Sequence, residues 1–361
     1  MTHTIIGWDI GGAHLKAALI DTTGNALQVV QVACPLWHGL KALALAIDEV
    51  LAELHEHNPN IHDAQIHAIT MTGELADIFP DRHTGVIQIA NLLDAKLNGK
   101  KHYYAGRHGF IEFAQVTENT VQIASANWLA SAQFVAQKQS QALLIDMGST
   151  TTDFVVIANG QPQCRGFNDA TRMRFEELVY TGMIRTPLMA VAGSVPFAGE
   201  WYTVAAEHFA TMADVYRLTG ELAEAEDMSD TADGGGKTMQ DSARRVARML
   251  GHDLADVEIA AWIGLAHVFK QTQLNTLKKA AMRHFSRYDL VNSVGIPGLL
   301  DTDAPIVGAG AGVEVVRALT QQLNRPFIRA TDMIAGSSLA EKNWAGVCFP
   351  AYAVANLALH L

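Results

Sequence analysis

The stretch 142-ALLIDMGSTTTDFVVI-157 repeats the plan of the stretch 5-IIGWDIGGAHLKAALI-20 near the start of the chain. In each stretch an apolar run ends in an aspartate, Asp9 or Asp146, a glycine follows two residues later, and a second strand-like run comes next. Turn residues then lead to a third predicted strand in both copies. Because an internal repeat outweighs local detail in assigning a fold, we predict two related α/β lobes.

A glycine-rich element late in the chain extends this pattern. Residues 305–307 are predicted to form a strand, Gly308 to Gly312 a loop, and residues 313–323 a helix. A strand that runs through a glycine loop into a helix N-terminus is a ready anion site. We place the first lobe at residues 1–125 and the second at residues 126–361, with a largely helical insertion at about 168–290 in the second lobe.

Composition and charge restrict the class of protein. The 361 residues are 49% hydrophobic, which is enough for packed cores, and the formal net charge of -11 argues against a nucleic-acid partner, because such binding needs a basic face. The three cysteines lie far apart, and we find neither a signal peptide nor a transmembrane span, so we expect a cytoplasmic protein with no membrane partner. A homodimer is expected only from the general frequency of that state.

The loops after the two aspartates have the chemistry of a phosphate site. A tight turn after a strand exposes successive backbone N–H groups, and glycine lets an anion approach them closely. Two carboxylates beside a bound diphosphate suit Mg²⁺, so we predict that Asp9 and Asp146 converge and hold this metal. Taken alone, Gly11-Gly12 could be a simple hairpin turn and Gly308–Gly312 a dinucleotide fingerprint. The predicted phosphate contacts are Gly11, Gly12, His14, Lys16, Gly148, Ser149, Thr150, Thr151, Gly308 and Gly310.

Several strings carry a family resemblance that spans most of the chain. They are 126-ANWLA-130, 179-VYTGMIRTP-187, 214-DVYRLTG-220 and 231-TADG-234, together with the glycine loops described above. With them the chain resembles the acetate/sugar kinase, heat-shock protein and actin superfamily. Within it, the chain is similar to the hydantoinase/oxoprolinase-related branch and to proteins linked to tetrahydromethanopterin one-carbon transfer. The resemblance implies a two-lobed, duplicated actin-like (ribonuclease H-like) α/β fold.

The resemblance also implies an activity, a transferase of methanofuran or related cofactor biosynthesis. In that reaction an aminomethylfuran that carries a methyl diphosphate is joined to the phenol of gamma-glutamyltyramine, so that an aryl ether forms and diphosphate leaves. A phenol has an ordinary pKa of about 10 and needs a base. We name Asp153 and Glu74 as candidates. Asp153 could instead help to hold metal-bound water, and Glu74 could cap a helix beginning at Leu75.

The middle of the chain is predicted to recognise the phenolic amine. Arg172, Arg174 and Arg185 lie close in sequence around Tyr180. One of these arginines could clamp a glutamyl carboxylate through a bidentate pair. For Arg172 and Arg174, a solvated helix face is an equal alternative.

A polar, glycine-rich stretch at residues 231–238 follows in the same region. It could be a simple linker, or a lid that brings Asp233 and Lys237 to the substrate. The predicted substrate contacts are Asn127, Tyr180, Arg185, Thr186, Asp233 and Lys237.

Two other functions stay open on the sequence alone. An ATP-dependent small-molecule kinase would use Asp153 as its base and would bind adenosine at Gly308–Gly312. A nucleotide-binding regulatory protein would respond to ATP without turning over a small molecule. ATP is therefore kept as a less favoured ligand beside Mg²⁺.

Overall fold

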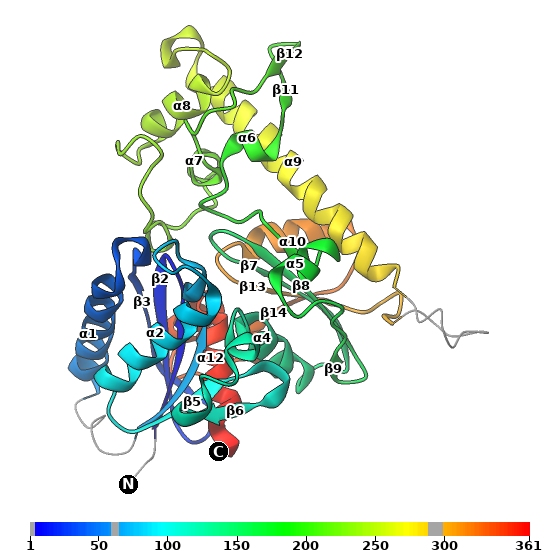
Figure 1. The fold of residues 1–361 in the computed structure, drawn as a ribbon. Coiled ribbons are helices and arrows are strands. Elements are labelled where there is room, and N and C mark those ends of the chain that lie inside the picture. Colours follow the sequence, from blue (N-terminus) through cyan, green and yellow to red (C-terminus); the bar gives the residue numbers. More distant parts are fainter. Residues whose placement is uncertain (1–3, 59–64, 288–298) are drawn as a thin grey trace. The chain divides into compact units, whose positions relative to one another are not determined.

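The computed structural model describes residues 4–58, 65–287 and 299–361 (Figure 1). The chain divides into two compact units. Unit 1 comprises residues 1–142, 155–171 and 328–361, and unit 2 comprises residues 143–154 and 172–327. These bounds differ from the predicted division at residue 125, because the C-terminal helices pack on the first sheet and so belong with the N-terminal half of the chain.

Unit 1 is built on a six-stranded sheet with the order β3-β2-β1-β4-β5-β6. Strand β1 runs antiparallel to β2 and parallel to β4, so Asp9 lies opposite Lys16 on one side and Thr70 on the other. The strands are β1 Thr4–Ile10, β2 His14–Ile20, β3 Ala26–Ala33, β4 Gln65–Met71, β5 Lys100–Tyr104 and β6 Phe110–Glu112.

Two helices cover one face of this sheet. They are α1 Leu40–His57 and α2 Arg82–Lys96. Alternate residues of β1, namely Ile6, Trp8 and Ile10, are fully buried in the same apolar core as residues of these helices. The period of two along the strand therefore sets which side chains of β1 meet α1 and α2.

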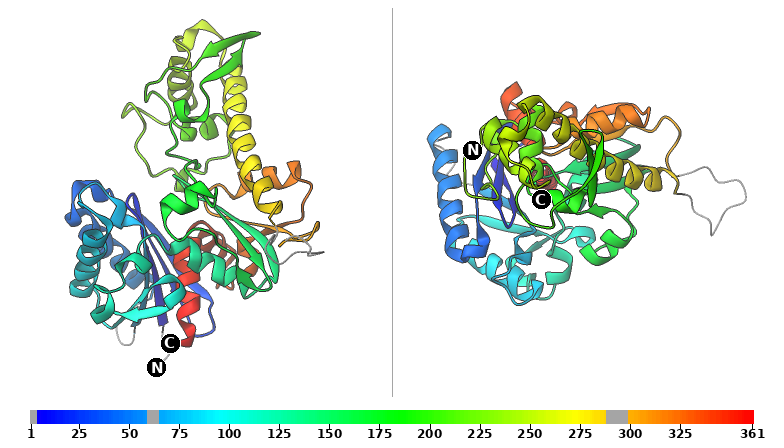
Figure 2. Two further views of the ribbon diagram at one scale, coloured as in Figure 1. Left: turned by 45° about the vertical axis from the view of Figure 1, so that its right-hand side comes forward. Right: turned by 90° about the horizontal axis from the view of Figure 1, so that it is seen from above.

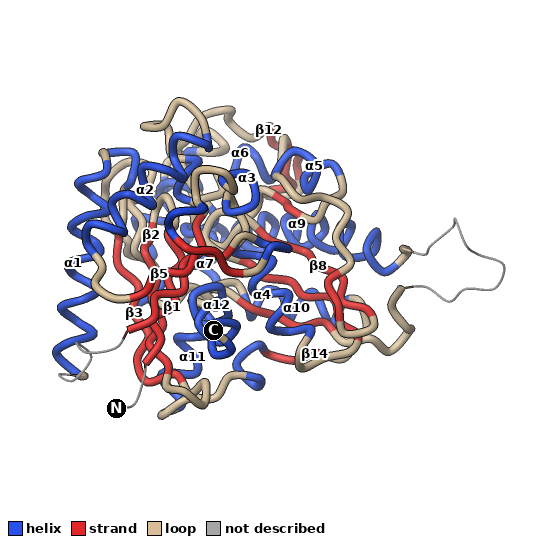
Figure 3. Tube along the Cα trace, turned by 60° about the horizontal axis from the view of Figure 1, so that its bottom comes forward, coloured by secondary structure: helices blue, strands red, loops and turns tan. Residues whose placement is uncertain are grey.

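The opposite face of the sheet is covered by α12 Phe349–Leu357, with α11 beside it (Figure 3). A methyl group at Gly7 of β1 would lie 2.0 Å from the Ala351 carbonyl oxygen, so only glycine permits this approach of helix to strand. The C-terminus is thereby tied to unit 1. The remaining helices outside unit 2 are α3 Thr120–Ile123, α4 Asn127–Ala136 and α11 Leu339–Val347, while α5 Asp169–Arg174 spans the boundary.

The second sheet repeats the strand order of the first. Its path is β10-β8-β7-β13-β14, with β9 paired to β8, and β7 is parallel to β13 as β1 is to β4. Strand β13 runs to Ala309, two residues further than predicted, and the remaining residues 310–312 of the predicted glycine loop lead into α10 Val313–Gln322. The duplication inferred from the sequence is therefore present in the fold. The strands are β7 Gln141–Met147, β8 Thr152–Ala158, β9 Gln161–Pro162, β10 Leu178–Val179, β13 Ile306–Ala309 and β14 Phe327–Arg329.

The region between β10 and β13 holds the predicted helical insertion. Its longest helix, α9, is yellow in Figure 2 and packs beside α7 and α8. The insertion also contains a two-stranded hairpin, β11–β12, which helical periodicity did not predict. The last predicted positions of the insertion, 288–290, lie outside the described residues. The elements are α6 Leu188–Val191, β11 Ser194–Phe197, β12 Glu200–Thr203, α7 Met212–Thr219, α8 Met239–Arg248 and α9 Ile259–Phe285.

Short 3-10 helices connect several of these elements. They are η1 Leu36–His38, η2 Gly73–Leu75, η3 Gly106–His108, η4 Phe113–Gln115, η5 Glu224–Glu226, η6 Leu254–Asp256, η7 Ala330–Met333 and η8 Ala358–His360. Within the three described ranges, every helix is too short or too polar to cross a membrane.

Candidate active site

The turn between β1 and β2 presents backbone N–H groups outward. The Gly11 N–H closes the turn by donating to the His14 carbonyl oxygen at 3.1 Å. The Gly12 carbonyl accepts from the Leu36 N–H at 3.0 Å, and since the C=O and N–H of a trans peptide point in opposite directions, the Ala13 N–H faces the other way. Within the described residues, the Gly12 and Ala13 N–H groups have no acceptor, so both are available to an anion.

Three predicted site residues meet at the end of β1. Asp9 is 4% exposed, and its Oδ1 accepts a hydrogen bond of 3.3 Å from Asn127 Nδ2 at the start of α4. Lys16 Nζ lies 4.0 Å from Asp9 Oδ2. His14, the first residue of β2, is also buried. The structure therefore gathers Asp9, Lys16 and Asn127 into one polar cluster.

Glu74 is a buried carboxyl group next to this turn. It lies in η2 directly after β4 and is 1% exposed. A methyl group at Gly73 would lie 3.1 Å from the Ile10 carbonyl oxygen, which places the segment against the turn. Ser125 Oγ donates to Glu74 Oε1 at 2.7 Å, while Oε2 has no hydrogen-bond partner among the described residues. Burial raises the pKa of Glu74 to about 7.

The alternative that Glu74 caps a helix beginning at Leu75 is wrong. The next α-helix, α2, begins at Arg82, and its N-cap is Asp81, whose carboxylate accepts from the Thr84 N–H at 2.7 Å. Helix α2 instead presses on Glu74 from the side, because a methyl group at Gly85 would lie 2.6 Å from the Glu74 carbonyl oxygen. The Glu74 backbone is thus held between the turn and α2.

The turn between β7 and β8 has the same construction. The Gly148 N–H donates to the Thr151 carbonyl oxygen at 2.9 Å. The carbonyl oxygens of Gly148 and Ser149 accept hydrogen bonds of 2.8 to 3.0 Å from the backbone of residues 183–185. The Ser149 and Thr150 N–H groups therefore point away from that segment, and neither has an acceptor in the part of the chain that the structure describes.

The predicted glycine loop touches the second aspartate. Asp146 is the second-to-last residue of β7 and is 8% exposed. Gly310 has a φ of 81°, and a methyl group there would lie 2.5 Å from Asp146 Oδ1, so glycine is required twice over. At Gly308 glycine is required by packing, because a methyl group there would lie 2.7 Å from the Phe327 ring.

The other candidate base, Asp153, is occupied by an ion pair. Arg172 is 1% exposed, and it donates from Nη1 to Asp153 Oδ1 at 2.7 Å and from Nη2 to the Glu177 carbonyl at 2.8 Å. Because the guanidinium is buried, both predictions for Arg172 are wrong: it lies neither on a solvated helix face nor where it could clamp a substrate. Arg174 is exposed, as the solvated face requires, and lies 5.8 Å from the Phe175 ring.

Arg185 and Thr186, predicted to contact the acceptor, lie in the segment that supports the β7–β8 turn. The Arg185 backbone N–H donates to the Ser149 carbonyl at 2.8 Å, and the Arg185 side chain is exposed. Thr186 Oγ1 accepts from the Gly182 N–H at 2.8 Å. Tyr180 is 53% exposed. Arg185 is therefore the predicted substrate contact best placed beside this turn.

Asp233 and Lys237 belong to a network of ion pairs elsewhere in unit 2. Asp233 lies 3.0 Å from Arg245 of α8, and Lys237 lies 3.3 Å from Asp227. The members of the network are Asp214, Arg217, Asp227, Asp233, Lys237, Arg245 and Arg248. These pairs fasten the glycine-rich stretch 231–238 to α7 and α8, which favours a structural role for that stretch.

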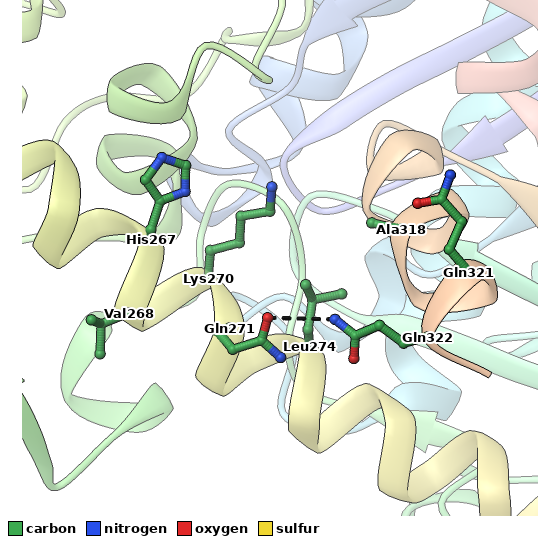
Figure 4. Close-up of a pocket in the computed structure, with 8 residues that line it drawn as sticks. All are labelled: His267, Val268, Lys270, Gln271, Leu274, Ala318, Gln321 and Gln322. Atoms are coloured by element: carbon green, nitrogen blue, oxygen red, sulfur yellow. Dashed lines mark hydrogen bonds between the residues drawn. The ribbon is translucent and has the colours of Figure 1, made fainter. Parts of the chain in front are cut away.

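A hollow of about 710 Å³ lies between α9 and α10 (Figure 4). Lys270 in its wall is paired with Glu221 at 2.5 Å, and Gln322 donates to Gln271 at 3.4 Å. The lining contains amides and short apolar groups but no arginine or aromatic ring other than His267, so it offers little surface on which an adenine could stack. The lining residues are His267, Val268, Lys270, Gln271, Leu274, Ala318, Gln321 and Gln322.

Two residues near the turns were not predicted from the sequence. Ser125 bonds Glu74 across 51 positions, and no local pattern signals such a pair. Gln273 is 1% exposed on α9, and a polar residue on the apolar face of a long helix could have been noticed.

Comparisons with known proteins found relatives in sequence and in fold. The hydantoinase/oxoprolinase family model matches residues 65–324. The chain is 29% identical over 296 residues to the (4-{4-[2-(gamma-L-glutamylamino)ethyl]phenoxymethyl}furan-2-yl)methanamine synthase of Methanocaldococcus jannaschii, covering 82% of this chain and 86% of that one. A protein of the same name from Methanococcus vannielii is 27% identical over 195 residues, covering 54% of this chain and 82% of that one.

Among solved structures, a nucleotide-free acetone carboxylase has a TM-score of 0.50 at 10% identity, covering 90% of this chain and 68% of that one. At this identity the likeness concerns the fold alone. Together with the repeated strand order, it confirms the predicted duplicated, actin-like α/β fold class.

Proposed function

We propose, on the premise that this chain belongs to the hydantoinase/oxoprolinase family, that it is a transferase of methanofuran-type cofactor biosynthesis. It joins an aminomethylfuran that carries a methyl diphosphate to the phenol of gamma-glutamyltyramine. The family is enzymatic, and both sequence relatives are named as synthases. The observation that carries the proposal is the pair of Asp-x-Gly turns, each with two outward backbone N–H groups, in a chain similar to such a synthase over 82% of its length.

The reaction requires one bond to break and one to form. The bond between the furanylmethyl carbon and the diphosphate oxygen breaks, and the diphosphate keeps the electron pair. The phenol oxygen forms the new bond to that carbon and gives up its proton. Because the furan ring stabilises positive charge on the carbon, the main task of the protein is to stabilise the departing diphosphate, which outward N–H groups of fixed turns do without reorganisation.

Glu74 is the proposed acceptor of the phenol proton. A general base works best when its pKa lies near the operating pH, and burial raises the pKa of Glu74 to about 7. Oxygen Oε1 is held by Ser125, which leaves Oε2, without a partner among the described residues, to receive the proton. We favour Glu74 over Asp153, since Asp153 is held by Arg172 at 2.7 Å.

The donor set of the turns fits Mg²⁺ bound together with substrate. Magnesium usually takes one or two carboxylates and completes its shell with water and phosphate oxygens. Asp9 and Asp146 are the second-to-last residues of the strands that enter the two turns. The described residues contain no group of three or more acidic, histidine or cysteine side chains that could hold a metal by themselves. The aspartate of each turn, Asp9 or Asp146, is the proposed ligand for the ion, which when bound would neutralise charge on the leaving diphosphate.

Arg185 is the proposed contact for the glutamyl carboxylate of the acceptor. Its side chain is exposed, while its backbone N–H fixes it to Ser149 of the turn. A guanidinium at such a place binds a carboxylate through two parallel hydrogen bonds. The acceptor would then be anchored within the segment that supports the anion turn.

The test is direct synthesis. The purified protein is incubated with Mg²⁺, the furan diphosphate and gamma-glutamyltyramine, and mass spectrometry looks for the aryl ether while a phosphate assay measures diphosphate. We expect ether and diphosphate in equal amounts. Folded protein that yields neither would remove the synthase proposal.

An ATP-dependent kinase is the second candidate, favoured by the glycine loop that leads into α10. The ion pair of Asp153 with Arg172 makes it the weaker one, because Asp153 would have to act as the base of the kinase. Calorimetry with Mg-ATP separates the two candidates. Tight binding with phosphoryl transfer to a small alcohol would favour the kinase.

A further inference from the structure

Gln273 links the helical insertion to the segment that supports the β7–β8 turn. Its side chain lies on α9 and is 1% exposed. Nε2 donates to Thr181 Oγ1 at 2.7 Å and to the Gly182 carbonyl at 2.9 Å, and Oε1 accepts from Tyr216 of α7 at 2.5 Å. One buried amide therefore joins α7, α9 and residues 181–182.

The orientation of this amide follows from its partners. The Gly182 carbonyl can only accept, so it must face the NH₂ end of Gln273. The oxygen end then faces Tyr216, whose hydroxyl donates to it. Burial raises the pKa of Tyr216 well above its usual range, so this donor keeps its proton at any physiological pH.

Residues 181–182 in turn press against the turn itself. A methyl group at Gly182 would lie 2.6 Å from the Ser149 carbonyl carbon and the Thr150 nitrogen. Thr152, the first residue of β8, donates from Oγ1 to the Thr181 carbonyl at 2.6 Å. The three N–H groups that follow Gly182, those of residues 183–185, are the donors that fix the carbonyl groups of the turn. A shift of residues 181–182 would therefore rotate the peptide planes that point N–H groups at the anion.

We propose that Gln273 is a positioning residue for the β7–β8 anion turn: its amide holds residues 181–182 against Ser149 and Thr150 so that their N–H groups face the diphosphate. The inference rests on the proposed function for the identity of the anion. It adds that the insertion, through α9, sets the affinity of this turn for diphosphate.

The test measures binding of inorganic pyrophosphate with Mg²⁺ by calorimetry, and KM for each substrate. Gln273→Met keeps the size of the side chain and removes its hydrogen bonds. We expect pyrophosphate affinity to fall about tenfold and KM for the furan diphosphate to rise similarly, while KM for the phenol acceptor stays unchanged. Tyr216→Phe leaves both Nε2 bonds in place and should weaken binding by less than about threefold.

Thr320→Val is the matched control, because Thr320 is also 1% exposed in unit 2 and its hydroxyl donates within α10 to the Val316 carbonyl at 2.8 Å. It should lose stability without losing pyrophosphate affinity. If Gln273→Met does not fold, Thr181→Val is measured instead, because it removes one of the two Nε2 bonds, the one to Thr181 Oγ1.

If Gln273→Met, or Thr181→Val where it is used instead, binds pyrophosphate as well as the unaltered protein does, this inference is overturned and the synthase proposal stands. A general rise in both KM values, with the control affected alike, would also overturn it, because a merely structural role predicts that result. An unaltered protein that binds no pyrophosphate would remove both proposals.

Discussion

The two Asp-x-Gly turns share a backbone and differ in what surrounds it. Each is closed by a glycine N–H that donates three residues ahead, at 3.1 Å in the first and 2.9 Å in the second. The first is braced from within its own sheet region, by residues 34, 36 and 72. The second is braced by residues 183–185, at the start of the insertion. The two copies thus share the backbone of the turn but differ in the residues that donate hydrogen bonds to it.

The charged residues of the two turns differ more than their backbones. Position seven after the aspartate is Lys16 in the first copy, 4.0 Å from Asp9, and Asp153 in the second, paired instead with Arg172. A buried titratable group, Glu74, stands beside the first turn. The first copy therefore has a candidate base beside its turn, and the second copy has backbone donors supported by the insertion.

Replacing the base should have the largest effect. Glu74→Gln keeps the shape and the Ser125 contact but cannot accept a proton, so kcat should fall by about 10²–10⁴-fold. The unaltered enzyme should gain activity as pH rises through about 7, where Glu74 ionises, and the variant should lack this limb. A pH–rate profile of both proteins checks the result, and an unchanged profile in the variant would assign the base elsewhere.

The same substitution should stabilise the protein at high pH. Burial raises the pKa of Glu74 from 4.5 to about 7, so ionising it in the folded state carries a cost. That cost is absent below pH 4.5, grows as pH rises, and is complete above pH 7, where it amounts to roughly 3 kcal/mol. Urea unfolding of Glu74→Gln and the unaltered protein should show a difference of about 1 kcal/mol at pH 5 that grows to roughly 3 kcal/mol at pH 8.

Gly182→Ala should have the next largest effect on function. Its methyl group would lie 2.6 Å from the backbone of Ser149 and Thr150, so the turn must shift, and we expect kcat/KM for the furan diphosphate to fall by about 10–100-fold. Gly264→Ala is the control, because Gly264 lies in α9 with open space around it and alanine should stabilise that helix. Steady-state kinetics of both variants checks this prediction. If Gly182→Ala were as active as Gly264→Ala, the turn would not depend on its contact with Gly182.

Ser125→Ala should have the smallest effect. The hydroxyl of Ser125 donates to Glu74 at 2.7 Å and so lowers the Glu74 pKa against the larger effect of burial. Its loss should move the rising limb of the pH–rate profile upward by about half a pH unit to one unit. Full activity should return at high pH, and a downward shift would contradict the placement of Glu74 as base.

How much of this was predictable depends on the distance between partners in sequence. The aspartates and the glycines two positions after them are local patterns, and they lie near strand ends and in turns as predicted. Of the predicted loop Gly308–Gly312, Gly308 and Ala309 instead lie in β13. The Asp153–Arg172 pair and the Gln273 bridge join residues 19 and 92 positions apart, and no local period encodes them.

The misplaced helix start at Leu75 has a different cause. An acidic residue next to an apolar one resembles a cap, but Asp81 is the residue whose carboxylate reaches the third N–H of the helix. The burial that shifts the pKa of Glu74 arises from α2 and Ser125, so neither its burial nor its pKa could be inferred from its neighbours in sequence.

The most direct measurement of the central claim is a calorimetric titration of Mg-pyrophosphate into the unaltered protein, Asp9→Asn and Asp146→Asn. If each aspartate helps its turn to bind diphosphate, the unaltered protein binds Mg-pyrophosphate, and each substitution weakens this binding by about tenfold or more. A substitution at either aspartate that leaves the affinity unchanged would contradict the account.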